Sequence, residues 1–357
     1  MFGNIKIHNF RGVSQLEIDD FRQVNLFVGK NNCGKSSVLE ALFLNAGASN
    51  PDLPRRINKL IRKMDNVDEP SFRTLFNNFD YSKSIIINTG VKDSNESREL
   101  TITPSIAARE MAIPVSATSE SIATNATGDD VNGLRLRFRL VDMEKHEKAI
   151  ETRLLVKGIN IQLESPSDFD FIDTLKGRLV SSDLSLAGLS EMFDKVQTEK
   201  KVDDILRVLQ KIEPALKEIR LGKDGALMCD VGLPKLVPMN IMGDGIIKVL
   251  CIILAIVASS DGILLIDEVE NGLHYSSLGI MWEAILHSAQ ELNVQVFATT
   301  HSYECIKAFC SSNGQMELGN EDNRRCYRIE RKGEKFRVET YNAEEVCASI
   351  DSGWEVR

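Results

Sequence analysis

The segment Gly29-Lys30-Asn31-Asn32-Cys33-Gly34-Lys35-Ser36 carries the strongest structural signal in this chain. It fits the phosphate-binding loop pattern G-x-x-x-x-G-K-[ST] at every fixed position. The apolar run Val24 to Val28 precedes it, and a helical pattern follows from Ser37. The pattern needs this strand–loop–helix order, because the N–H groups of the loop and the helix N-terminus together form an anion site. The segment therefore predicts a site for the phosphates of a nucleotide.

Each residue of this loop has an expected role. Lys35 is expected to reach the β- and γ-phosphates, and the Ser36 hydroxyl is expected to hold Mg²⁺. The other residues that we expect to line the bound phosphates are Gly29, Asn31, Asn32, Cys33, Gly34 and Ser37.

Composition limits the class of protein. The chain has 357 residues, enough for one large domain or two intimately joined ones, and 43% of them are hydrophobic. Its net charge of −9 argues against a protein that coats nucleic acid through bulk charge, although a local basic patch stays possible. The seven cysteines contain no C-x-x-C pair, which indicates reduced, intracellular usage.

We expect a cytoplasmic protein with no membrane contact. Residues 1–20 do not have the pattern of a signal peptide. The most apolar stretch, Ile246 to Ala258, is too short to span a bilayer and contains Lys248, so it is interpreted as a buried helix.

Apolar runs far apart in the sequence predict one sheet. Residues 3–10 and 14–21 alternate apolar and polar side chains, which predicts an antiparallel pair that leads into the strand 24–28. Further apolar strands at 262–266 and 294–299 flank a predicted helix at about 276–291, an order that implies a parallel sheet.

The predicted nucleotide-binding core is therefore split, with residues 1–50 and 236–310 belonging together and residues 51–235 inserted. Residues 311–357 are expected to form a C-terminal β-hairpin and tail packed on this core. The insertion is predicted to hold four parts: a basic helix (51–65), β-hairpins (84–164), a mobile polar loop within them (116–132) and a helical segment (183–220).

Two carboxylates follow the apolar strand Ile263-Leu264-Leu265-Ile266. They lie at its C-terminal end, where α/β sheets place their ligands. Asp267 is suited to hold the hydration shell of Mg²⁺, and Glu268 to orient and deprotonate an attacking water. An Asp-Glu pair also ends many ordinary strands, so its meaning depends on the phosphate-binding loop upstream.

His301 stands at the end of the next predicted strand, in Thr299-Thr300-His301-Ser302. A histidine there can donate a hydrogen bond to a γ-phosphate oxygen and help to place the water. Taken alone, a histidine at a strand end is more often structural.

The turn Met242-Gly243-Asp244-Gly245 opens the apolar helix and presents backbone N–H groups at its positive end. It is interpreted as a second anion site. The alternative is an ordinary helix start with Asp244 as its cap.

These four motifs, in this order, resemble the ABC-type ATPase head of the SMC, RecF and OLD (overcoming lysogenization defect) branch. The resemblance is greatest to the stand-alone OLD-like bacterial ATPases that have no nuclease module. It rests on the phosphate-binding loop, the turn Asn9-Phe10-Arg11-Gly12, the run Asp267-Glu268-Val269-Glu270-Asn271-Gly272-Leu273-His274, and the position of His301.

The resemblance implies an α/β P-loop NTPase with a mostly parallel core sheet, an antiparallel β subdomain and a helical insertion. It also implies a head-to-tail dimer with ATP and Mg²⁺ between the two chains. Gly243, Asp244 and Gly245 of one chain would face the γ-phosphate held by Lys35 of the other. Asn271 would lie between the two sites, and Arg11 would approach the nucleotide from the first strand.

Departures from the family pattern modify the expected activity. The signature serine is missing, because Met242 or Asn240 stands near its place, which suggests slow or conditional hydrolysis. No glutamine occurs between Gln23 and Gln162, so the metal-sensing glutamine is unassigned, and residues 75–80 are its possible replacement. The chain after His301 lacks a nuclease motif, which implies a separately encoded effector such as a nuclease.

Several functions stay open. The leading hypothesis is an ATPase that senses or clamps DNA, or that regulates an effector in phage defence. The alternatives are an ATP-bound scaffold with little turnover and a RecF-like DNA repair ATPase. Two basic features offer possible contacts to DNA, although such groups are more often simply solvated faces. They are the group Arg55, Arg56, Lys59, Arg62 and Lys63 and the group Arg135, Arg137 and Arg139.

Overall fold

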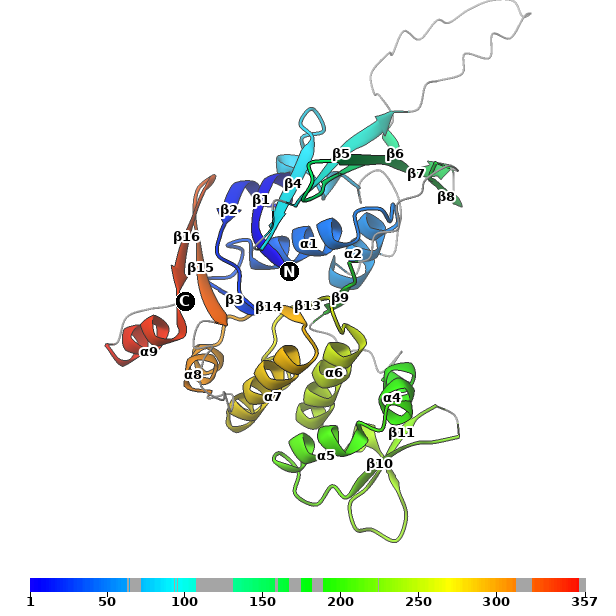
Figure 1. Ribbon diagram of the computed structural model, residues 1–357, viewed down its shortest axis with the longest axis vertical. Helices are drawn as coiled ribbons and strands as arrows, with labels where there is room; N and C mark the ends of the chain where they lie inside the picture. The colour runs from blue at the N-terminus through cyan, green and yellow to red at the C-terminus, as the bar shows by residue number, and fades with distance from the viewer. Residues whose placement is uncertain are drawn as a thin grey trace, which may run out of the picture.

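A computed structural model gives the fold of the chain (Figure 1). It describes residues 1–62, 64, 72–92, 94, 96–106, 131–157, 160–166, 175–181, 189–223, 225–312 and 323–352. Most of these residues form two sheets with helices between and below them.

The core sheet has the strand order β16-β15-β3-β14-β13-β9 among the described residues. Its neighbours pair in parallel, except that β15 and β16 are antiparallel. This arrangement confirms the predicted mostly parallel core sheet. The strands are β3 (Val24–Val28), β9 (Gly177–Val180), β13 (Ile263–Ile266), β14 (Gln295–Thr299), β15 (Arg324–Lys332) and β16 (Lys335–Tyr341).

Three strands of this sheet, β9, β15 and β16, come from outside the residues expected to form the core. β9 lies within the stretch predicted as an insertion and pairs with β13, while β15 pairs directly with β3. The C-terminal hairpin is therefore part of the core sheet, whereas the sequence suggested a hairpin packed on it. The boundaries of the domains themselves stay a prediction.

The second sheet is antiparallel, with the order β2-β1-β4-β5-β6-β7-β8 among the described residues. It joins the N-terminal pair to the hairpins of the inserted stretch. Residues 116–130 of the expected loop lie outside the described part of the chain. The strands are β1 (Phe2–Phe10), β2 (Val13–Ile18), β4 (Ile85–Val91), β5 (Ser97–Ile106), β6 (Val131–Val141), β7 (Glu147–Lys157) and β8 (Asn160–Glu164).

Helix α1 (Lys35–Ala46) lies between the two sheets, and α6 (Asp244–Ala258), α7 (Leu278–Glu291) and α8 (Tyr303–Ser311) cover the other face of the core sheet (Figure 1). Strand β3 is buried throughout because it faces both layers. Its residues Val24, Leu26 and Val28 pack with α6 to α8, and Phe27 packs on the α1 side. The phosphate-binding loop thus leaves a strand that is fixed from both faces.

The remaining elements lie at the edges of these layers. Helix α2 (Leu53–Arg62) follows α1, and α9 (Ala343–Asp351) packs beside α8. Helices α4 (Leu189–Thr198) and α5 (Val202–Gln210) precede a small antiparallel sheet of β10 (Glu218–Leu221), β11 (Leu227–Asp230) and β12 (Val237–Pro238). Short 3-10 turns are η1 (Asn77–Phe79), η2 (Met239–Ile241) and η3 (Tyr275–Ser277). None of the described helices is long and apolar enough to cross a membrane.

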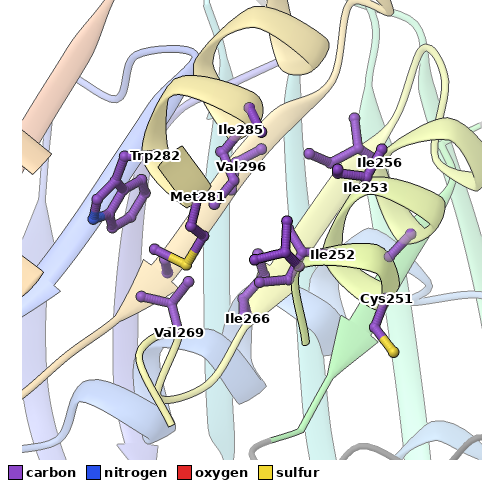
Figure 2. Packing of buried hydrophobic residues seen from close by; sticks show 14 of the residues in the cluster. Cys251, Ile252, Ile253, Ile256, Ile266, Val269, Met281, Trp282, Ile285 and Val296 are labelled. Carbon is purple, nitrogen blue, oxygen red and sulfur yellow. The ribbon is translucent and has the colours of Figure 1, made fainter. Parts of the chain in front are cut away.

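Packing between α6, α7 and the core sheet is dense (Figure 2). Ile252 and Ile256 of α6 and Ile285 of α7 are buried beside Val296 of β14. The Trp282 Nε1 group donates a hydrogen bond of 3.2 Å to the Cys305 carbonyl, so even the indole is satisfied in this core.

Ile285→Ala is expected to lower the free energy of unfolding by about 2–5 kcal/mol, because it leaves a cavity at a fully buried position. Denaturant unfolding measures this change. The matched control is Met143→Ala at a 66% exposed position, which should change stability by no more than about 0.5 kcal/mol. Equal effects from the two variants would contradict this description of the core.

Candidate nucleotide site

Backbone geometry fixes the phosphate-binding loop between β3 and α1. Gly29 has φ 139° and Gly34 has φ 104°, conformations that residues with a Cβ rarely adopt. A Cβ built on Gly29 would lie 2.4 Å from the Ile329 carbonyl oxygen of β15. Helix α1 begins directly after Gly34, and no side chain caps it. The loop therefore presents free backbone donors at the positive end of a helix.

Lys35 lies inside this loop. Its ammonium Nζ donates to the Gly29 carbonyl at 2.6 Å and to the Lys30 carbonyl at 3.0 Å. The buried Cys33 thiol lies beneath, and burial raises its pKa, so it stays neutral at physiological pH. Lys35 is thus the cation at the centre of the loop, where phosphate oxygens would take the place of carbonyl acceptors.

Asp267 joins three motifs at the end of β13. Its Oδ1 accepts hydrogen bonds from the Ser36 Oγ at 3.0 Å and from the Thr299 Oγ1 at 2.6 Å. The Thr299 Oγ1 accepts in turn from the Glu268 N–H at 2.8 Å. Sequence reasoning did not select Thr299, although its position at the end of the strand beside β13 was a usable signal.

Glu268 and His301 both face the cavity, and each is about half exposed. Glu268 has φ 48°, a conformation that is uncommon for a non-glycine residue and frequent at functional sites. The His301 Nδ1 lies 4.0 Å from Glu268 Oε1 and 3.2 Å from Glu270 Oε1. The backbone N–H of His301 also donates a hydrogen bond to Glu270 Oε1 at 3.0 Å. Glu270 therefore contacts both the backbone and the ring of His301.

These groups line one cavity of about 980 Å³, the size of a site for a nucleotide or a larger ligand. It brings together the loop, Asp267, Glu268, His301 and Arg11, as the sequence predicted. Its lining consists of Arg11, Gly12, Asn31, Asn32, Gly34, Lys35, Ser36, Ser37, Arg62, Met64, Thr74, Phe76, Asn78, Phe79, Asp267, Glu268, Thr299, His301 and Arg331.

Arg11 reaches the cavity wall, but its donors are engaged in the interior. Its Nε donates to Glu40 Oε2 at 2.7 Å and its Nη2 to Asn58 Oδ1 at 2.6 Å. Arg62 binds the other Glu40 oxygen at 2.6 Å. Burial lowers the pKa of Arg11, and Glu40 opposes that shift. A nucleotide contact by Arg11 stays a prediction, and its observed role is structural.

The second anion motif does not line this cavity. Gly243, Asp244, Gly245 and Asn271 are absent from its lining. Helix α6 begins at Asp244, and its N-cap is Gly243 with φ 93° and no side-chain cap, so Asp244 is not the cap. Asn271 is exposed, and its N–H donates to the Glu268 carbonyl at 3.0 Å.

The segment 75–80 reaches the cavity through Phe76, Asn78 and Phe79. Asn78 and Phe79 have positive φ, at 53° and 58°, and Phe79 is 61% exposed. A metal-sensing role for this segment stays a prediction. The sequence carried no signal for Arg331 of β15, because it belongs to no motif.

Acidic neighbours offset the two basic features considered for nucleic acid. Arg55 and Arg56 pair with Asp52 on α2. On β6, Arg135 lies 3.5 Å from Glu151, and Arg139 lies 3.4 Å from Glu99. Lys63 lies outside the described residues. These ion pairs reduce the positive field that either surface would offer to phosphates.

The residues present fit Mg²⁺. No group of three His, Cys, Asp or Glu side chains that could hold a metal occurs in the described part of the chain. The Ser36 hydroxyl and the Asp267 carboxylate are adjacent hard oxygen donors. Mg²⁺ is commonly held by one or two carboxylates together with substrate phosphates, so these two residues suffice for it.

A phosphate-binding loop, a strand-end carboxylate bonded to its serine, and a histidine on the next strand define a P-loop ATPase. The chain belongs to the family described as "AAA domain, putative AbiEii toxin, Type IV TA system", which matches residues 24–306.

The chain is also similar to individual known proteins. An "ATP/GTP phosphatase" of Helicobacter pylori is 26% identical over 344 residues, covering 86% of this chain and 87% of the relative. "DNA replication and repair protein RecF" of Coxiella burnetii is 36% identical over 78 residues, covering 21% of this chain and 20% of RecF. A solved structure of an SMC head bound to the C-winged helix domain of ScpA aligns with this chain at 10% sequence identity and a TM-score of 0.48. The alignment covers 97% of this chain and 99% of the SMC head chain.

Proposed function

We propose that this chain is a Mg²⁺-dependent ATPase of the cytoplasm that works as a head-to-tail dimer and regulates a separately encoded effector. Turnover is slow or conditional, because Met242 stands near the place of the signature serine. The effector is a protein such as a nuclease, as in OLD-like phage defence.

The observation that carries the chemistry is the bonded set Ser36–Asp267–Thr299 with Glu268 beside it. Lys35 binds the β- and γ-phosphates, and Glu268 orients the attacking water and takes its proton. His301 donates to a γ-phosphate oxygen. When bound by Ser36 and Asp267, Mg²⁺ supplies charge neutralisation at the phosphates.

The dimer is supported by the position of the second anion motif. The Met242–Gly245 turn lies outside the cavity of its own chain, and among the described residues, its chain neighbours apart, none has an atom within 4 Å of a Cβ built on Gly243. Two exposed apolar side chains belong to the segments beside this turn. Ile241, 65% exposed, directly precedes it, and Tyr275, 69% exposed, follows by two residues Leu273, whose side chain lies 3.7 Å from a Cβ built on Gly245. A second copy of the chain would cover these side chains and present the turn to a γ-phosphate.

The effector is supported by the family description, which names a toxin–antitoxin system. A scaffold with little turnover is the alternative for the same partner. Direct DNA clamping has less support, because the basic surfaces are largely paired with acidic residues. The similarity to RecF covers only 78 residues, so it gives little support to a role in DNA repair.

Mixing two inactive variants tests the dimer. Gly243→Arg places a bulky side chain in the proposed interface, and Lys35→Ala disables the loop. Each alone is expected to lower ATP turnover by about 10³-fold or more. A head-to-tail mixed dimer has one site with both lesions and one intact site, so the mixture should turn over ATP at least about tenfold faster than either variant.

The matched control is Gly333→Arg, because Gly333 also has a positive φ, 65°, and no neighbour in the described part of the chain lies within 4 Å of a Cβ built on it. This substitution in the turn between β15 and β16 should leave turnover near the parental rate. Absence of recovery in mixed dimers that are shown to form would contradict the head-to-tail arrangement. Loss of ATP binding by Gly243→Arg would contradict a role in trans.

A further inference from the structure

Two buried polar atoms beside the site lack partners. Lys248 of α6 is 3% exposed, and the Glu270 side chain is 10% exposed. Within the described residues, neither the Lys248 Nζ nor the Glu270 Oε2 has a hydrogen-bond partner. One atom is a donor and the other an acceptor. A buried polar atom without a hydrogen-bond partner costs free energy of folding. A protein therefore retains such atoms where another conformation of the protein pairs them.

The two residues belong to elements that touch. A Cβ built on Gly245 would lie 3.7 Å from Leu273 Cδ2 and 3.8 Å from the Gly272 carbonyl oxygen. The first turn of α6 therefore packs on the loop that carries Glu270. Lys248 follows Gly245 by three residues and so lies on the same face of the helix.

Charge supports this placement. Burial lowers the pKa of Lys248. Cys251 opposes that shift most, followed by the carboxylates of Glu270, Asp267 and Glu268 in that order. The amine thus lies in the field of the catalytic carboxylates while bonded to none of them.

The other oxygen of Glu270 is already used. Glu270 Oε1 accepts from the His301 N–H at 3.0 Å and lies 3.2 Å from the His301 Nδ1. Any movement of the Glu270 carboxylate therefore moves the acceptor that orients the imidazole ring.

We propose that Lys248 and Glu270 are positioning residues that form an ion pair when the Met242–Gly245 turn engages a γ-phosphate. The ion pair then fixes the position of the Glu270 carboxylate, and this carboxylate in turn fixes the orientation of the His301 ring. This linkage rests on the proposed head-to-tail dimer, in which the turn serves the partner's site and His301 serves the site of its own chain. The Lys248–Glu270 pair consequently couples the two ATP sites.

The central test variant is Lys248→Met, which keeps an unbranched side chain and removes the charge. Turnover should fall by about tenfold or more while the dissociation constant for ATP stays within about twofold, a separation that marks a positioning role. The cooperativity of turnover with ATP concentration should be lost. The melting temperature should stay equal or rise, because an unpaired buried amine is removed.

Three further variants complete the design. Lys248→Arg retains the charge and should keep turnover within about threefold of the parent. Glu270→Gln should resemble Lys248→Met, and the double variant should be no slower than the slower single one, because both remove one interaction. The matched control is Ile252→Ala, one turn further along the same helix, which should lower the melting temperature and leave turnover unchanged.

Parental turnover and cooperativity in Lys248→Met would overturn the linkage, as would additive losses in the double variant. A parental chain that does not hydrolyse ATP contradicts the proposed function and the linkage with it. Parental hydrolysis that is lost in Lys35→Ala but kept in Lys248→Met contradicts the linkage alone.

Discussion

Lys35→Ala is expected to weaken ATP binding by about 10²–10⁴-fold. The Lys35 ammonium is the side-chain cation at the centre of the phosphate-binding loop, held by the Gly29 and Lys30 carbonyls. Hydrogen bonds to charged groups contribute about 1.5–3 kcal/mol each, and Lys35 is expected to make two, to the β- and γ-phosphates. Each 1.4 kcal/mol corresponds to about tenfold in affinity, which gives this range. Isothermal titration calorimetry measures the effect.

The matched control is Lys307→Ala, which removes an exposed lysine on α8, away from the cavity lining. It lowers the net charge by the same amount and should leave the dissociation constant within about twofold. Undiminished affinity in Lys35→Ala would contradict the assignment of the loop.

Glu268→Gln is expected to bind ATP with parental affinity and to lower turnover by about 10³-fold. The base is lost, and general bases contribute about 10²–10⁴-fold. The hydrogen bonds of Asp267 to Ser36 and Thr299 are untouched, so binding and chemistry separate. Because hydrolysis no longer ends the ATP-bound state, the dimer should accumulate when ATP is added. Light scattering after size-exclusion chromatography measures the fraction of dimer.

Glu283→Gln provides the control, since Glu283 of α7 is a surface carboxylate that pairs with Lys211 and does not line the cavity. Its turnover should match that of the parent. Hydrolysis at the parental rate in Glu268→Gln would show that Glu268 is not the base.

The sequence predicted the centre of the fold and of the site because motif and element coincide there. Four of the five residues from Val24 to Val28 are apolar, and the stretch forms a strand buried on both faces. The glycines at 29 and 34 mark two of the three positive-φ positions of the loop, and Asn32 is the third. Asp267 and His301 follow apolar strands that had to end at the same edge of a parallel sheet.

Long-range pairing could not be predicted in the same way. β9 has only four residues, a glycine and an arginine among them, and its place beside β13 depends on backbone pairing that leaves no local pattern. β15 is rich in arginine, a composition typical of a hairpin on the surface of a core. It nevertheless pairs with β3 within the core sheet. Strand order depends on the whole chain, so a short stretch of sequence contains little information about it.

Side-chain partners were the least predictable part of the site. Arg11 was expected at the nucleotide, but Glu40 and Asn58, far along the chain, hold its guanidinium in the interior. Thr299 and Glu270 were present in the quoted motifs, yet only their contacts with Asp267 and His301 reveal what they do. Such contacts depend on tertiary packing rather than on sequence spacing.

The position of β3 between β14 and β15 has a consequence for synthesis on the ribosome. The whole phosphate-binding motif lies within the first 50 residues, but the strands beside β3 begin at residues 295 and 324. Contacts this distant in sequence form late and slowly. The nascent N-terminal segment therefore emerges with an apolar strand that lacks both neighbours. ATP can assist folding only after the C-terminal strand has emerged, and until then this strand is a natural target for a chaperone.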